Sequence, residues 1–148
     1  MDSSYEKGFN KQLDEFFGLT PDNEQDSLIL MSYIFLFNNK FKNLMNYFII
    51  KDYNEVYNFI KNNENIFELL DEIKPILSSY FNNNKFLLRI SKNPENSDAK
   101  LKLIIKADYS FEDTDDLVKR LVKLNSEIRP FKRQFDVVNE FLVDVECL

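Results

Sequence analysis

Five acidic residues crowd one short stretch of the sequence: Asp108, Glu112, Asp113, Asp115 and Asp116. Carboxylates at this density can bind a divalent cation or the basic surface of a partner protein. The glycine and the ligand spacing of a calcium-binding loop are missing, so we expect no metal site here. The acids also suit the first turn of a helix, where the helix dipole favours negative charge. Partner contact and helix capping therefore both remain open for Asp113, Asp115 and Asp116.

A basic stretch follows the acidic one. Its members are Lys119, Arg120, Lys123, Arg129, Lys132 and Arg133, and only Glu127 opposes them. Three of these could join the lysines of a predicted strand in a face that binds nucleic acid or phosphate, made of Lys100, Lys102, Lys106, Arg129, Lys132 and Arg133. The competing interpretation is a solvated helix end, with the strand lysines paired across the sheet to Asp144 and Glu146.

The negative charge is concentrated in the first half of the chain. Residues 1–74 contain 13 acidic and 7 basic residues, whereas residues 75–148 contain 12 of each. An acidic helical face that also carries tyrosines could bind a basic partner surface. The candidate contact residues in this half are Glu64, Glu68, Asp71, Glu72, Tyr53 and Tyr57.

The composition excludes several kinds of chemistry. The chain has no histidine, one cysteine, no tryptophan and two glycines. These counts exclude metal sites built on histidine or cysteine, histidine-based catalytic triads and glycine-rich phosphate loops. Cys147 has no histidine to activate it. A net charge of −6 also argues against general binding to nucleic acid. We therefore expect no cofactor and no enzymatic activity.

Length and hydropathy predict one folded domain over residues 1–148, with 44% hydrophobic and 15% aromatic residues. The first seven residues are polar and no apolar signal region follows them. The longest apolar run, Leu28–Phe37, is too short to span a membrane. The lone cysteine fits a reducing compartment, so we expect a soluble, cytoplasmic protein.

Residues 1–84 are predicted to form four to five helices. Apolar spacing predicts a helix over residues 5–17, a second from Thr20-Pro21 to residue 37 and a short one over 41–49, with Asn38-Asn39 as a break. Asp52 and Glu55 resemble a capping box that starts another helix. The last helix covers residues 65–81, and Pro75 should kink or split it.

Residues 85–148 are predicted to form a β-β-α-β unit. The strands cover residues 86–91, 100–107 and 141–146, and the helix runs from Ser110 until Pro130 stops it. The last strand should return parallel to the second. The simplest sheet order places the first of these three strands in the middle. The expected fold class is α+β, with the helical bundle packed on this three-stranded unit.

The C-terminal part resembles small uncharacterised prokaryotic β-β-α-β proteins. The residues that carry the resemblance are Leu87–Ile90, Asn93-Pro94-Glu95, Leu103–Ile105, Ser110–Leu124 and Phe141–Glu146. The resemblance implies a bacterial, archaeal or phage setting and no particular activity.

These observations favour a small acidic protein that acts by binding another protein, such as an inhibitor, an antitoxin or immunity-type protein, or an adaptor. The alternative is the lysine-rich module that binds nucleic acid or phosphate. A third hypothesis is a homo-oligomer that buries the apolar helix over residues 28–37 between its subunits.

Overall fold

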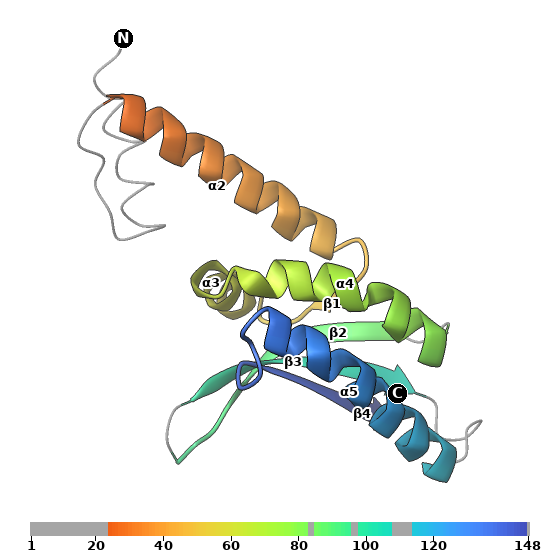
Figure 1. Cartoon of the computed structure of the whole chain (residues 1–148). Coiled ribbons are helices and arrows are strands. Elements are labelled where there is room, and N and C mark those ends of the chain that lie inside the picture. Colours follow the sequence, from red (N-terminus) through yellow and green to blue (C-terminus); the bar gives the residue numbers. More distant parts are fainter. Residues whose placement is uncertain (1–23, 83–84, 96–97, 108–113, 148) are drawn as a thin grey trace. The chain divides into compact units, whose positions relative to one another are not determined.

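The computed structural model describes residues 24–82, 85–95, 98–107 and 114–147. The elements are α2 (Glu24–Leu44), β1 (Ile49–Ile50), α3 (Tyr53–Asn62), α4 (Asn65–Tyr80), β2 (Lys85–Lys92), β3 (Ala99–Ala107), α5 (Thr114–Gln134) and β4 (Phe141–Cys147) (Figure 1). The chain divides into two compact units, residues 1–42 and 43–148. The helix expected over residues 5–17 lies outside the described residues, and a single domain stays a prediction.

Helix α2 supplies the described residues of the first unit. The break predicted at Asn38-Asn39 is wrong, because α2 continues through both asparagines to Leu44. Asparagine lowers the stability of a helix by only roughly 0.5 kcal/mol relative to the better helix formers. The apolar spacing of Phe37, Phe41 and Leu44 meanwhile continues across this point, and the Phe37 and Phe41 rings stack with their centroids 6.4 Å apart.

The second unit is built on a four-stranded sheet in the order β1-β2-β3-β4. Strands β1 and β2 are parallel, β2 and β3 form an antiparallel hairpin, and β3 and β4 are parallel. The predicted parallel return of the last strand is confirmed. The predicted order is wrong, because β3 lies in the middle of the three predicted strands. The two-residue β1 occupies the other side of β2, which leaves the side of β3 for β4.

Helices α4 and α5 lie side by side over one face of this sheet (Figure 1). The alternation of β3 places Leu101, Leu103 and Ile105 on the covered face, where all three are fully buried. Helix α4 contributes Leu70 and Ile73 to the same core. The second unit therefore has a two-layer α+β architecture, which confirms the expected α+β class but not the three-stranded sheet.

Both helices continue through an internal proline. Helix α4 extends past Pro75 to Tyr80, and α5 extends past Pro130 to Gln134, so the predicted stop at Pro130 is wrong. Each proline removes one backbone hydrogen bond. Packing of the flanking apolar residues, such as Ile128 beside Pro130, holds the helix together.

Helix α5 ends instead at Gln134, and Asp136, two residues later, adopts a left-handed conformation with φ of 55°. The Asp136 N–H donates to the Arg133 carbonyl at 3.2 Å, and the Val137 N–H donates to the Lys132 carbonyl at 2.9 Å. These two bonds form a Schellman motif, in which glycine is the usual left-handed residue. Val137, the residue that follows, is buried.

Three further details differ from the expectations. Within the described residues, the predicted helical part has three helices rather than four to five, and the sheet has four strands rather than three. Helix α3 begins directly after Asp52, as expected. Asp52 is left-handed, however, and its side chain makes no capping hydrogen bond. The start of the α5 region at Ser110 lies outside the described residues.

Candidate protein-interaction surface

Four acidic residues line the solvent-exposed side of α4. Glu64 precedes the helix directly, Glu68 and Glu72 follow at intervals of four residues, and Asp71 lies beside them. All four are exposed. Like charges four residues apart destabilise a helix by roughly 0.2–0.5 kcal/mol per pair. Only Asp71 has a described ion pair, to Lys74 at 2.9 Å. Glu64 and Glu68 lie at the N-terminal end of α4, where the helix dipole favours acidic residues, whereas Glu72 lies further along the helix.

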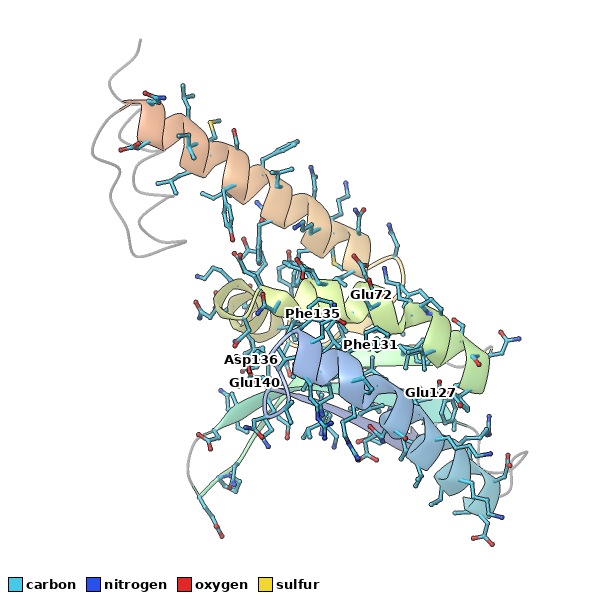
Figure 2. The ribbon with its side chains drawn as sticks, viewed as in Figure 1. Glu72, Glu127, Phe131, Phe135, Asp136 and Glu140 are labelled. Carbon is cyan, nitrogen blue, oxygen red and sulfur yellow. The ribbon has the colours of Figure 1, made fainter. Side chains whose placement is uncertain are left out.

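A second line of residues lies on the neighbouring helix. Glu127 and Phe131 on α5 and Phe135 directly after it are spaced four residues apart, so they share one side of the helix. Figure 2 shows Phe131 and Phe135 on the side of α5 that faces α4, with Glu72 above them on α4. Phe131 and Phe135 are both partly exposed. Glu72 and the two aromatic rings thus lie along the boundary between the two helices.

Three hydrogen bonds hold α4 and α5 antiparallel along this boundary. The Asn65 amide donates to the Phe135 carbonyl at 3.0 Å, at the start of α4. At its end, the Tyr80 hydroxyl donates to Glu127 at 2.8 Å, and Arg120 donates to the Tyr80 carbonyl at 2.9 Å. We call the three glutamates of α4 and the line of residues on α5 the α4–α5 surface: Glu64, Glu68, Glu72, Glu127, Phe131 and Phe135. Asp71 is not part of it, because it lies about 120° around α4 from Asn65, the residue that contacts Phe135.

The ionisation of two groups bears on this surface. Partial burial raises the pKa of Glu64 above its ordinary value. The hydrogen bond to Glu127 is the largest cause that raises the pKa of Tyr80, followed by burial and by the charge of Glu127. The phenol therefore stays protonated and keeps donating to Glu127 at neutral pH. The surface presents carboxylates beside apolar rings, which suits a basic surface that has an apolar centre.

The remaining predicted contact residues lie elsewhere. Asp113 lies outside the described residues, and Asp115 and Asp116 begin α5, where Asp116 pairs with Arg120 at 3.2 Å. That end of α5 lies beside the end of α4, about 24 Å along the helix from Glu64. The capping interpretation of these acids fits their place in the first turn.

The two predicted tyrosines lie on α3. Tyr53 and Tyr57 stack with their ring centroids 6.0 Å apart, and burial followed by the charge of Tyr53 raises the pKa of Tyr57. Helix α3 packs against β2. The tyrosines therefore form a separate aromatic pair on another element.

The basic residues of the alternative face divide into two groups. On the sheet face opposite α4 and α5, Lys102 lies 3.4 Å from Asp144 and Lys106 lies 3.1 Å from Glu146. The expected cross-strand pairing is thereby confirmed. Ile104 between these lysines is buried, although the alternation placed it on the wetter face.

The second basic group lies near the end of α5. Burial is the largest cause that lowers the pKa of Lys132, and the charges of Arg129 and Lys100 lower it further, while Glu140 opposes them. Lys100, Arg129 and Lys132 are therefore close enough to interact. Arg133 also lies in the last turn of α5. Figure 2 shows Glu140 beside Asp136 after that helix.

Two features absent from the described residues bear on other functions. No group of three or more histidine, cysteine, aspartate or glutamate residues in these parts of the chain could hold a metal ion. None of the helices described above has the length and apolar character of a membrane span. The cytoplasmic location and the absence of enzymatic activity stay predictions.

No protein-family model, curated protein or solved structure matches this chain. The resemblance of its C-terminal part to small prokaryotic β-β-α-β proteins therefore stays a prediction. The function must be argued from the surface itself.

Sequence reasoning missed the half of the α4–α5 surface that α5 contributes. Glu127, Phe131 and Phe135 recur every four residues, which is a helical spacing. The predicted stop at Pro130 placed both phenylalanines beyond the helix. A helix extended through Pro130 would have aligned them with Glu127.

Proposed function

We propose that this protein acts by binding another protein through the α4–α5 surface, as an inhibitor, an antitoxin or immunity-type protein, or an adaptor. The partner contributes a basic surface with an apolar side chain at its centre. The carboxylates of α4 contact the basic groups, and Phe131 and Phe135 contact the apolar one.

One observation carries this proposal: a stripe of like-charged residues lies beside two partly exposed aromatic rings. Glu64, Glu68 and Glu72 lie four residues apart and repel one another, which offsets part of the favourable effect of the helix dipole on the first two. A basic partner surface would relieve that repulsion on binding. Aromatic residues near the centre of an interface commonly supply much of its binding energy.

The experiment compares three versions of the protein as bait in extracts of its native source. The first is the wild type, the second is Glu68→Lys with Glu72→Lys, and the third is a control, Glu55→Lys with Glu95→Lys. Both double variants change four units of charge at exposed positions. Circular dichroism verifies that all three are folded. Captured proteins and nucleic acids are both identified.

The expected result is a protein that the wild type and the control retain and that the α4 variant loses. Retention should weaken with salt, because the acids of α4 are exposed. Equal retention by all three baits would refute the electrostatic contact at α4. Nucleic acid on all three baits, released by salt, would instead favour the basic group at Lys100, Arg129 and Lys132.

A further inference from the structure

Three basic residues lie together where the end of α5 meets the start of β3. Lys100 belongs to β3, and Arg129 and Lys132 lie three residues apart on one side of α5. The β3–β4 register begins with the pair Leu101 and Phe141, so Lys100 lies at the end of the sheet, directly before that pair. We call Lys100, Arg129 and Lys132 the basic corner. It shares no residue with the α4–α5 surface, so the inference below stands apart from the proposed function.

Backbone hydrogen bonds fix the end of α5 against the start of the strands. The Leu101 N–H donates to the Glu140 carbonyl at 2.8 Å, which places Lys100 beside Glu140. The Glu140 N–H donates to the Val137 carbonyl at 3.3 Å, and the Val137 N–H donates to the Lys132 carbonyl at 2.9 Å. Figure 2 shows Glu140 at this end of α5. The three bonds connect β3 to the last turn of α5, so the backbone itself sets the position of the basic corner.

The charges of the basic corner are not paired within the described residues. The other two lysines of β3, Lys102 and Lys106, form ion pairs with carboxylates of β4. In the described parts of the chain, no ion pair involves Lys100, Arg129 or Lys132. Lys100 and Lys132 are half-buried, and burial, followed by the charges of Arg129 and Lys100, lowers the pKa of Lys132. Holding these cations together costs free energy, which a bound anion would recover.

The local charge indicates the class of anion. Three positive charges in the basic corner and the one negative charge of Glu140, which opposes them at Lys132, give a net charge of +2. The exposed Arg133 and Asp136 near this end of α5 carry opposite charges and offset each other. A phosphate monoester carries a charge of about −1.5 to −2 at neutral pH. A carboxylate or a phosphodiester carries a single charge and leaves the corner partly unneutralised.

We propose that the basic corner binds a dianionic phosphate group, as free phosphate or as the monoester of a small molecule. The guanidinium of Arg129 is a planar fork that can donate to two phosphate oxygens, and the two lysines add compact charges. A nucleic-acid backbone fits less well, because it needs a row of such positions. The net charge of −6 opposes it, and Lys102 and Lys106 are already paired.

The first test titrates the isotope-labelled full chain with inorganic phosphate, glycerol phosphate and dimethyl phosphate at constant ionic strength. Backbone amide shifts in the NMR spectrum report binding. Inorganic phosphate and glycerol phosphate should give saturable shifts at residues 99–101 and 132–137. Dimethyl phosphate, which carries one charge, should bind about tenfold more weakly. Binding of both dianions identifies a site open to a monoester, and binding of inorganic phosphate alone identifies a site for the free anion.

The second test repeats the titration with variants of α5. Arg129→Gln and Lys132→Gln should each weaken phosphate binding about tenfold, because each removes a charged hydrogen-bond donor. Arg129→Lys keeps the charge but loses the fork, so its affinity should lie between those of Arg129→Gln and the wild type. Lys123→Gln is the matched control, because Lys123 is exposed on another side of the same helix. It should leave the affinity within about twofold of the wild type. Circular dichroism verifies that every variant is folded.

Three outcomes would overturn the proposal. No saturable shift with inorganic phosphate or glycerol phosphate would show that the corner does not bind this class of anion. Equal weakening by Lys123→Gln and Lys132→Gln would show that the overall charge of α5, and not the basic corner, attracts the anion. Dimethyl phosphate that binds as tightly as glycerol phosphate would show that a dianion is not required, and would favour the backbone of a nucleic acid.

Discussion

Replacing Pro130 with alanine is expected to stabilise the protein. Pro130 lies inside α5, where it cannot donate to the Ser126 carbonyl and its ring crowds that carbonyl. The side chain is exposed, so alanine removes little packing. Proline in a helix interior costs about 3 kcal/mol relative to alanine. Since the backbone of α5 already accommodates the ring, we expect a gain of about 1–3 kcal/mol, or roughly 2–4 °C in Tm for each kcal/mol.

The assay is urea unfolding followed by far-ultraviolet circular dichroism. The midpoint should rise while the dependence on urea stays unchanged, which identifies a change in stability rather than in the unfolded state. Pro94→Ala is the control, because Pro94 is exposed in the turn between β2 and β3 and outside any helix. That change should give no gain. If Pro130→Ala were no more stable than the wild type, α5 would not continue through this position. Phe131 and Phe135 would then not align with Glu127.

Three further predictions concern the second unit, each measured by urea unfolding. Asp136→Gly should raise the free energy of unfolding by about 0.5 kcal/mol, because a φ of 55° strains aspartate more than glycine. A lower free energy of unfolding would contradict this explanation. A double-mutant cycle on Lys106 and Glu146, which are 3.1 Å apart, should give about 0.2–1 kcal/mol of coupling that salt reduces; zero coupling would refute the pair. Lys132→Gln should raise the free energy of unfolding at neutral pH. Burial and neighbouring cations lower the folded pKa of Lys132, so the unfolded chain binds its proton more tightly. The benefit should therefore shrink as pH rises toward the ordinary lysine pKa, and a constant benefit would exclude this cause.

The sheet of the second unit was largely predictable, because one-sided burial imposes a period of two. Leu101, Leu103 and Ile105 alternate with lysines, and the register places them on the covered face as expected. The order of the strands was not predictable in the same way. The order depends on which edge of the β2–β3 hairpin is free to pair with β4. Strand β1 occupies the edge of β2, but with only two residues it leaves almost no pattern in the sequence.

Helix boundaries failed where single residues were taken as breaks or stops. Asn38, Asn39 and Pro130 all lie inside helices, and Pro75 does not split α4. Burial of the residues around them outweighs the local cost of each. The end of α5 before the left-handed Asp136 was missed because this conformation is usual for glycine rather than aspartate.

The acidic half of the candidate surface was predictable, and its aromatic half was not. Charge and helical spacing indicated Glu64, Glu68 and Glu72 directly. The position of Glu72 near Phe131 depends on the antiparallel packing of α4 and α5, which joins residues 47 and 70 positions apart in the chain. Periodicity within one helix carries no information on which other helix lies beside it.

The most direct test of protein binding at the α4–α5 surface is site-specific photo-crosslinking. Benzoylphenylalanine replaces Phe131 in one version of the protein and Leu142 in a control. Both residues are at least partly exposed, but Leu142 lies in β4 on the opposite face of the sheet. Binding at the α4–α5 surface predicts one cross-linked protein from position 131 that is absent from position 142. The same binding predicts that Glu68→Lys with Glu72→Lys abolishes this product. A partner that cross-links from position 142 and not from position 131 would refute binding at this surface.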